Sequence, residues 1–410
     1  MNDQPLEARV CVVGGGPAGI VLGYLLARAG FSVVVLEKHS DFLRDFRGDT
    51  VHPSTMTVLD ELGLLDEFLK RPHSEIVHLS GHVGADTLEI GDFSRVPAKT
   101  KFLAIMPQWD FLNFLAEKGR AYAGFQLMMN TAATDVVKEG ERITGVRATG
   151  PEGAFDIRAD VVVACDGRSS TLRSALGITP RDLGAPMDVF WMSLPKRTSD
   201  QNAAFGFIGA GAVLVLIDRN DYWQCGYVIA KGTADEVRAR GLGAFRSEIA
   251  SIAPVVADRV NEIKSWDDVK LLTVEVDRLE RWHVPGLLFI GDAAHAMSPI
   301  GGVGINLAVQ DAIATANILS AALQRPGPVG EDVLAAVQRR RMYPTVMTQG
   351  LQVQIQRHII SRVLASKAPP KRAPLILRML TSIPAFRFLP AYIVGIGFRP
   401  EHASTLVRGS

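Results

Sequence analysis

The residues best suited to do chemistry near the start of the chain are three glycines, Gly14, Gly16 and Gly19, spaced as G-x-G-x-x-G. An apolar strand is expected before them at 10–13, and a helix after them at 20–29. In such a turn the first glycine permits the tight bend, the second lets the backbone approach a phosphate, and the third lets the helix pack on the strand. The helix N-terminus then offers free amides and a positive dipole end, so the pattern predicts a pyrophosphate-binding site.

An acidic residue supports this prediction at the end of the next expected strand, 32–36. Glu37 follows that strand directly, where a carboxylate can accept hydrogen bonds from ribose hydroxyls. A negative charge there disfavours a 2′-phosphate, so the pattern favours FAD or NAD over NADP as the bound dinucleotide. The alternative interpretation is a glycine-rich structural turn.

Two later segments place an acid just beyond an apolar strand. Asp166 follows the run 161–165, and Asp292 follows the run 287–290 after one glycine. Open α/β sheets present their ligand-contacting groups at the carboxyl ends of strands, so we expect both acids beside the dinucleotide, with Asp292 on the ribityl hydroxyls of FAD. The alternatives are a turn residue for Asp166 and a helix N-cap for Asp292.

A long helix is expected over 303–323, beginning next to Gly302. The free amides of its first turn and its positive end would face the pyrimidine end of a flavin, where the reduced ring carries negative charge. We expect the amides of Ile305 and Asn306, with the Asn306 side chain, to complete this cradle.

The composition is that of an ordinary globular enzyme: 410 residues, 47% hydrophobic and 21% charged, enough for two or three domains. Three cysteines lie within apolar runs, which favours buried thiols and a cytoplasmic location. No apolar run approaches the ~18 residues of a spanning helix, and the first ten residues do not resemble a secretory signal. No spacing of Cys and His indicates a metal site.

The charge is unevenly distributed along the chain. From residue 350 to the end, nine Lys or Arg residues face one acid, Glu401, although the whole chain carries only +1. Because apolar clusters accompany these cations, peripheral contact with an anionic membrane surface is one interpretation, and a helical subdomain packed on an acidic body is the other. The cations are interleaved with aliphatic residues, which argues against nucleic-acid binding.

Together, the glycine pattern, Arg47 with its following glycine, Gln108 and the two acid motifs resemble the single-component flavoprotein aromatic hydroxylases, the p-hydroxybenzoate hydroxylase-like monooxygenases. The resemblance covers about 9–345. It implies FAD as the cofactor, NADPH or NADH as a transient co-substrate, and dioxygen. It also implies two half-reactions: NAD(P)H reduces FAD, and a flavin hydroperoxide then hydroxylates a small aromatic substrate.

The resemblance also implies roles for individual residues. Pro299 is expected to place its carbonyl beside the flavin and the substrate hydroxyl, and is the one catalytic position. The cofactor contacts implied are Arg47 and Gln108 to the flavin or pyrophosphate, Val136 to adenine through its backbone, Asp166 to the pyrophosphate and to transient NAD(P)H, and Asp292 to the ribityl chain.

The fold class predicted is α/β. A Rossmann-like FAD-binding domain of the glutathione-reductase type is expected at 1–179 and 275–345, interrupted by an antiparallel β-sheet substrate domain at 180–274. That sheet would take further strands from about 76–100, and 346–410 would form a helical C-terminal segment. A sheet inserted between flavin-contacting segments can lie over the ring and form a closed pocket.

The substrate must be read from the inserted sheet. Aromatic residues that alternate along its strands are candidate contacts, although core packing is the other explanation. These candidates are Trp191, Phe205, Trp223 and Tyr227. No clear Arg or Lys cluster marks the sheet for a carboxylate, so we expect a neutral, hydrophobic aromatic or polycyclic substrate.

Two other functions stay open at this point. One is an FAD-dependent reductase or dehydrogenase of a lipid-like or quinone substrate, which the basic apolar tail would suit. The other is a non-catalytic flavin-binding module. The oligomeric state expected is a monomer or a homodimer.

Overall fold

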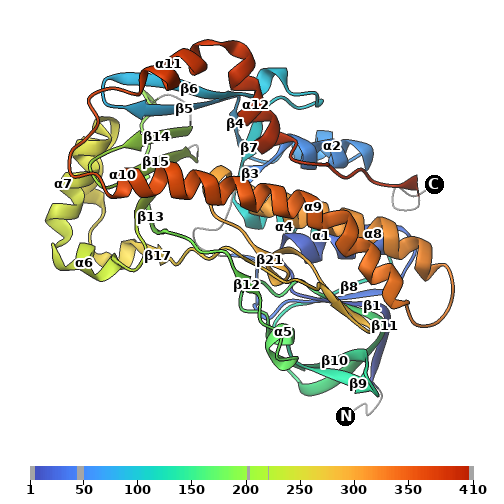
Figure 1. The fold of residues 1–410 in the computed structure, drawn as a ribbon. Coiled ribbons are helices and arrows are strands. Elements are labelled where there is room, and N and C mark those ends of the chain that lie inside the picture. The colour runs from blue at the N-terminus through green and yellow to red at the C-terminus, as the bar shows by residue number, and fades with distance from the viewer. Residues whose placement is uncertain (1–4, 44–49, 201–203, 220, 406–410) are drawn as a thin grey trace.

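The computed structural model describes residues 5–43, 50–200, 204–219 and 221–405. Two β-sheets lie at opposite ends of an elongated molecule, and the long helix α9 runs across both (Figure 1). The chain is therefore a mixed α/β protein.

The first sheet carries the glycine pattern. Its strands follow the order β19-β20-β11-β1-β2-β8; β10 also pairs antiparallel with β11, and β9 pairs antiparallel with β10. The neighbours from β20 to β8 are parallel, and their apolar runs are buried on both faces, as parallel strands require. The bounds are β1 Leu6–Val13, β2 Val33–Leu36, β8 Phe125–Met128, β9 Ala132–Glu139, β10 Arg142–Gly150, β11 Gly153–Ala164, β19 His283–Val284 and β20 Leu287–Phe289.

Three helices form the layer packed on this sheet. Helix α1 (Pro17–Arg28) contacts both α4 (Gln108–Gly119) and α8 (Gly304–Leu323). The helix expected at 303–323 is thus present, one residue shorter at its start. Nearly every side chain of α1 is buried, because the helix lies between the sheet and α8.

The second sheet follows the order β17-β13-β16-β15-β14-β5-β6. Its bounds are β5 His78–Val83, β6 Asp86–Asp92, β13 Met187–Pro195, β14 Ala204–Ile208, β15 Val213–Asp218, β16 Tyr222–Ala230 and β17 Lys270–Leu272. The expectation of a purely antiparallel sheet is wrong at one pair, because β14 and β5 run parallel. These two strands come from distant parts of the chain, so no hairpin fixes their relative direction.

One face of this second sheet is covered by α7 (Leu242–Ile252) and the 3₁₀ segment Pro254–Glu262. Shorter elements complete the body. They are α2 Pro53–Glu61, α3 Leu65–Phe68, α5 Thr171–Ala175, α6 Ala234–Ala239, β3 Thr50–Val51, β4 Ser74–Ile76, β7 Leu103–Ile105, β12 Arg181–Asp182, β18 Asp277–Arg278 and β21 His295–Ala296.

The C-terminal part is helical but has no break at residue 346. Helix α9 spans Glu331–Ile355, so the expected boundary falls inside one continuous helix. A π-helical turn at Gln356–Ile360 leads into the short α10 (Ser361–Leu364). Helices α11 (Leu375–Ser382) and α12 (Pro384–Gly395) then pack against β6 (Figure 1). Within the described ranges, no helix combines the length and the apolar character needed to cross a bilayer.

A buried ionic network ties these parts together at Asp311 in α8, whose side chain is fully buried. Its carboxylate contacts His295 Nε2 at 2.6 Å and Arg341 Nε of α9 at 2.8 Å, and it accepts from the Gly291 amide at 3.1 Å. Arg341 also pairs with Glu401 at 3.2 Å. Burial alone would raise the pKa of Asp311, but the charges and hydrogen bonds of His295 and Arg341 outweigh it and hold that pKa below its ordinary value.

Substituting Asp311→Asn should destabilise the fold by about 3–5 kcal/mol, because it removes the more deeply buried of the two carboxylates that compensate the buried Arg341 guanidinium and leaves only Glu401. Thermal unfolding at neutral pH would show the loss as a lower melting temperature. The control is Asp156→Asn, which removes a partner of Arg147 in an exposed pair on the first sheet and should change stability little. Equal melting temperatures for the two variants would contradict this account.

Candidate active site

The three motifs that lie far apart in the sequence meet at one edge of the first sheet. A Cβ at Gly14 would lie 2.4 Å from the carbonyl oxygen of Cys165, so the first motif touches the second directly. The Ile290 amide donates to Ala164 O at 3.0 Å, which places the third motif on the other side of β11. The carboxyl ends of β1, β11 and β20 therefore carry all three.

The glycine turn has the geometry of a phosphate-binding loop. Gly14 has a φ of 108°, and a Cβ at Gly19 would lie 1.8 Å from Gly14 O, so neither position tolerates a side chain. Gly16 is the N-cap of α1, and a Cβ there would meet nothing within 4 Å. The space in front of the helix N-terminus is thus open on the protein side, as a bound pyrophosphate requires.

Glu37 lies beside this turn. Its carboxylate accepts from the Gly15 amide at 3.1 Å and from the His39 amide at 3.0 Å, and the side chain is largely buried. These bonds orient the carboxylate toward the glycine loop. Its contact with a ribose remains a prediction.

Asp166 carries an unsatisfied acceptor. Its Oδ2 accepts from the Leu172 amide at 3.2 Å, whereas Oδ1 is buried and has no hydrogen-bond partner among the described residues. Burial raises the pKa of this carboxyl, against the hydrogen bonds from Ser170 and Leu172 that lower it. An orphaned oxygen of this kind is suited to a ligand, because it accepts from a hydroxyl when ionised and donates to a phosphate when protonated.

An ion pair links the second motif to the third. Arg168 Nε lies 3.2 Å from Asp292 Oδ2, and both side chains are partly exposed at the edge of the sheet. Arg173, buried beneath them, donates to Ala293 O at 3.0 Å. Neither arginine was predicted to have a role, although both follow Asp166 within seven residues.

The turn that carries Pro299 is held from two sides. The Gly302 amide donates to Pro299 O at 3.0 Å, and Gly301 and Gly302 both have positive φ. Gly302 O accepts from Thr50 Oγ1 at 3.0 Å and lies 3.1 Å from His52 Nε2. Burial lowers the pKa of His52, against the hydrogen bonds to Gly302 and Val394. His52 was not predicted to have a role. In the structure its ring contacts Gly302 of this turn and Val394 of α12, so it connects the two elements.

The first turn of α8 lies immediately after Gly302. Asn306 is buried, and its Oδ1 accepts from Ser54 Oγ at 2.9 Å and Thr55 Oγ1 at 2.8 Å. This side-chain oxygen therefore fastens α8 to α2, and the Nδ2 donor of Asn306 and the backbone amides of the turn are the groups that can face a flavin. Ile305 is half-buried in the same turn.

The remaining cofactor candidates lie outside the three motifs. Gln108 is the first residue of α4 and is half-buried. Val136 lies in β9, and its amide donates to the side chain of Asp135 at 2.8 Å. Arg47 lies outside the described residues.

The four aromatic substrate candidates divide between the two faces of the second sheet. Trp223 and Tyr227 are buried, with Phe205, in the cluster beneath α7, so packing is the role that the structure gives these three. The pleat of a strand sends alternate side chains to opposite faces. Trp191 points to the other face, where it joins an apolar cluster that includes Ile300, the neighbour of Pro299.

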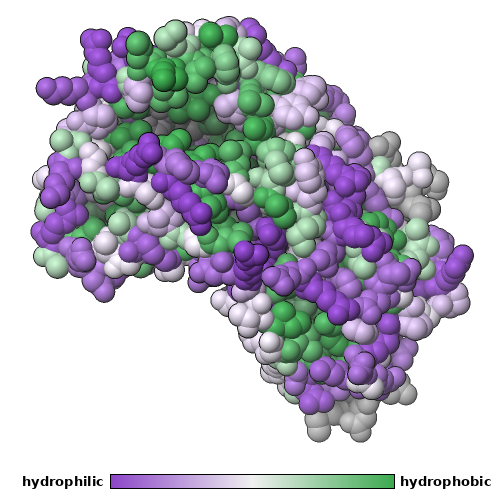
Figure 2. Space-filling view, viewed as in Figure 1, coloured by the Kyte–Doolittle hydropathy of each residue, from purple (hydrophilic) through white to green (hydrophobic). Residues whose placement is uncertain are grey.

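A row of cross-strand neighbours that includes three glycines crosses that same face. Gly206 pairs with Gly81 on one side and with Val215 on the other, and Val215 pairs with Gly226, which pairs with Trp191. A Cβ at Gly206 would meet nothing within 4 Å. The sheet therefore has open space above its centre, and Figure 2 shows a hollow lined with apolar side chains between the α10 region and α11.

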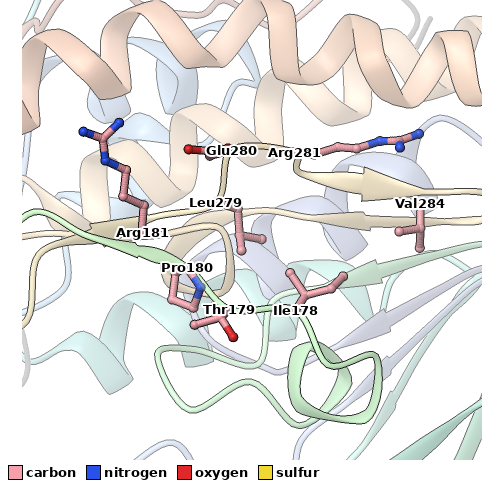
Figure 3. Close-up of a pocket in the computed structure, with 8 residues that line it drawn as sticks. All are labelled: Ile178, Thr179, Pro180, Arg181, Leu279, Glu280, Arg281 and Val284. Carbon is pink, nitrogen blue, oxygen red and sulfur yellow. The ribbon is translucent and has the colours of Figure 1, made fainter.

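Two other features of the described residues lie away from this hollow, which is called the cleft below. One is a pocket of about 400 Å³ near β12 and β18, and the other is a cluster of three possible cation ligands on β5 and β6. The pocket is lined by Ile178, Thr179, Pro180, Arg181, Leu279, Glu280, Arg281 and Val284 (Figure 3), and the cluster by His78, Glu89 and Asp92. None of these residues belongs to the three motifs.

Comparison with known proteins agrees with this geometry. A family model described as an FAD binding domain matches residues 7–346. The chain is 35% identical over 381 residues to 6-methylpretetramide 4-monooxygenase of Streptomyces rimosus, covering 92% of this chain and 90% of the relative. This chain belongs to the FAD-dependent aromatic monooxygenases.

Further relatives agree with the assignment. The monooxygenase is 25% identical over 342 residues to para-nitrophenol 4-monooxygenase of Pseudomonas sp. strain WBC-3, covering 82% of this chain and 83% of that one. The crystal structure of P. aeruginosa PqsL in complex with 2-aminobenzoylacetate shares the fold, with a TM-score of 0.75 and 24% identity over 88% of this chain and 97% of that one. FAD is thus the cofactor, and the open helix terminus at Gly16 and the orphaned Asp166 oxygen are compatible with it.

Substituting Gly16→Val should remove FAD without unfolding the monooxygenase. The backbone at Gly16 suits any residue, and a new side chain would enter only the space in front of α1. We expect at least a tenfold loss of FAD per chain, measured by absorbance after purification, at an unchanged apoprotein melting temperature. Gly243→Val, which also enters open space but on the distant α7, should keep its FAD. A yellow Gly16→Val protein would contradict the assignment of this terminus.

Proposed function

We propose that the monooxygenase hydroxylates a neutral, hydrophobic, polycyclic aromatic substrate that lies between the Pro299 turn and the open face of the second sheet. One observation carries this proposal: Ile300, next to Pro299, packs in the same apolar cluster as Trp191 on the sheet. The flavin-facing turn and the sheet thus share one surface, and a flat ring system can contact both.

The free space supports a substrate of more than one ring. Gly206 and Gly226 remove two side chains from the centre of the sheet, and Trp191 covers Gly226 closely, since a Cβ there would lie 3.0 Å from its ring. An aromatic wall beside an uncovered strip is suited to a planar ligand. The name of the Streptomyces rimosus relative, 6-methylpretetramide 4-monooxygenase, agrees with a substrate of this class.

Each part of the protein has a distinct task in the proposed reaction. Bound FAD, reduced by NAD(P)H, activates dioxygen and supplies the oxygen-transfer chemistry. The N-terminus of α1 would hold the pyrophosphate, and Glu37, Asp166 and Asp292 the ribose and ribityl hydroxyls. The amides at the start of α8 would stabilise negative charge at the pyrimidine edge of the ring.

The second sheet would exclude water from the reacting atoms. Its inner face presents apolar side chains to the Pro299 turn, so a substrate seated there displaces solvent. The Pro299 carbonyl is the acceptor we propose for the substrate hydroxyl. Because that carbonyl also accepts from the Gly302 amide, its direction is fixed before the substrate arrives.

The type of the first sheet and the division of the chain into domains are part of the same proposal. The parallel order of β20 to β8 supports a Rossmann-like sheet of the glutathione-reductase type. We propose a cofactor domain (1–179 and 275–345), a substrate sheet (180–274, with strands from about 76–100) and a helical C-terminal segment that begins within α9, since that helix continues without a break through residue 346. The monooxygenase would work in the cytoplasm as a monomer or homodimer, with NADH or NADPH binding only transiently.

A peripheral membrane role for the C-terminal segment is also proposed. Helices α11 and α12 expose apolar side chains: Leu375, Ile376, Met379, Ile383, Phe386 and Leu389. Lys367, Lys371 and Arg372 lie exposed just before them. An apolar band beside cations is typical of helices that lie on anionic membranes. Arg378 and Arg387, in contrast, pair with Asp86 and Glu89 of β6 and so hold the segment on the body.

The reaction class is tested with isotopic dioxygen. The FAD-loaded protein should consume NADH or NADPH faster in the presence of a polycyclic phenol, and mass spectrometry should find one atom of ¹⁸O from ¹⁸O₂ in the product. Reduced product without ¹⁸O would indicate a reductase or dehydrogenase. An FAD-loaded protein whose NAD(P)H oxidation responds to no aromatic compound would indicate a flavin-binding module.

Gly206→Leu should obstruct the substrate site while leaving the cofactor in place. The new side chain would enter open space above the sheet, so we expect kcat/KM for the hydroxylated phenol to fall at least about tenfold, equivalent to about 1.4 kcal/mol. FAD content and melting temperature should not change. Gly243→Leu on α7 is the matched control, and unchanged kinetics in Gly206→Leu would place the substrate elsewhere.

A further inference from the structure

Three glutamines share one face of α9 and its continuation. Gln349, Gln352 and Gln356 are spaced by three and four residues, which brings their side chains into a line along the helix. All three are buried. A row of buried amides is unusual, because each polar atom removed from water needs a hydrogen-bond partner.

The first two glutamines find their partners in β18 and in the segment 296–300, which carries Pro299. Gln349 Nε2 donates to Asp277 O at 2.7 Å and to Ala296 O at 2.9 Å. Gln352 Nε2 donates to Ser298 O at 3.0 Å and to Ile300 O at 2.9 Å, and its Oε1 accepts from the Ser298 amide at 3.2 Å. The row therefore follows this loop toward the flavin-facing turn.

The third glutamine has no such partner. Gln356 is completely buried, and neither its Nε2 nor its Oε1 has a hydrogen-bond partner among the described residues. Leaving both atoms of an amide unsatisfied is costly for a folded protein. Gln356 also begins the π-helical turn at Gln356–Ile360, and single π-turns inserted in α-helices are frequent at functional sites.

Residues one helical turn on either side of Gln356 contact the proposed substrate cleft. One turn before it, Gln352 holds Ile300, and one turn after it, Ile360 packs in the apolar cluster that contains Ile300 and Trp191. In the same cluster the Trp191 Nε1 donor is also buried without a partner. Unsatisfied polar atoms thus gather at the cleft where the substrate is proposed to bind.

We propose that the Gln356 amide recognises a polar edge of the substrate that carries a donor and an acceptor side by side, as in a lactam or a carboxamide. A primary amide donates through Nε2 and accepts through Oε1, so its complement must do the reverse at the same spacing. A carboxylate offers only acceptors and would leave Oε1 unpaired. This proposal rests on the substrate site assigned above, with Trp191 Nε1 as an additional donor to the same ligand.

The test compares two ligands that differ in a single donor. The FAD-loaded full chain is titrated with the tricyclic lactam 6(5H)-phenanthridinone and with its N-methyl derivative, and binding is followed by equilibrium dialysis and by the flavin spectrum. The natural protein should bind the lactam about tenfold or more tightly than the N-methyl compound. No binding of the lactam, or equal affinity for the two compounds, would overturn the proposal.

Variants separate recognition from a structural role. Gln356→Leu should lose the preference for the lactam while its melting temperature without ligand stays equal or rises, because an unsatisfied buried amide has been removed. Gln354→Leu, an exposed glutamine on the same helix, should keep the preference. A Gln356→Leu protein that still discriminates, or that melts well below the natural protein, would assign Gln356 to the core instead.

This experiment does not depend on turnover. If ¹⁸O never enters a product but the lactam preference is present and disappears in Gln356→Leu, the hydroxylation proposal fails and the recognition site stands. If hydroxylation is observed without any lactam preference, the reaction stands and the role of Gln356 fails.

Discussion

The buried carboxylate of Asp311 is the interaction on which the rest of the site depends. It holds the Gly291 amide and His295 on one side and Arg341 on the other, so the third motif, α8 and α9 have a single common anchor. A charge in this position is tolerable only because the Arg341 guanidinium, the His295 ring and an amide compensate its desolvation. The anchored elements in turn set the position of the Pro299 turn and of the glutamine row of α9.

The sequence predicted FAD as the cofactor and the strands and glycine turn of the first sheet, whereas the contacts of single residues with FAD stay predictions. Gly14, Gly19 and the acids after β11 and β20 obey short-range rules, because a tight turn or a strand end imposes its own residue types. Their meeting at one edge follows from the parallel order of the strands. What the sequence could not predict is which polar side chains pair over long distances, such as His52 with Gly302 or Asp311 with Arg341.

The residues that line the proposed substrate site were harder to predict, for a physical reason. Trp223 and Trp191 lie on neighbouring strands with the same type of side chain, yet the pleat sends them to opposite faces. Alternation indicates that two faces exist but not which one meets the flavin. The glutamine spacing in α9 was visible in the sequence. The residues that hydrogen-bond to Gln349 and Gln352, but not to Gln356, belong to a loop more than fifty residues away, so the sequence did not show which of the three amides would be unsatisfied.

The pairing of β5 with β14 has a consequence for how the molecule can be built. This internal pair of the second sheet joins residues 79–83 to residues 204–208, so neither segment can complete the sheet until well over a hundred intervening residues have been synthesised. Such a distant pairing slows folding and leaves strand edges uncovered in the meantime. A fragment limited to 180–274 would keep β14 as a bare edge, prone to aggregation, so the second sheet cannot be transplanted as this segment alone.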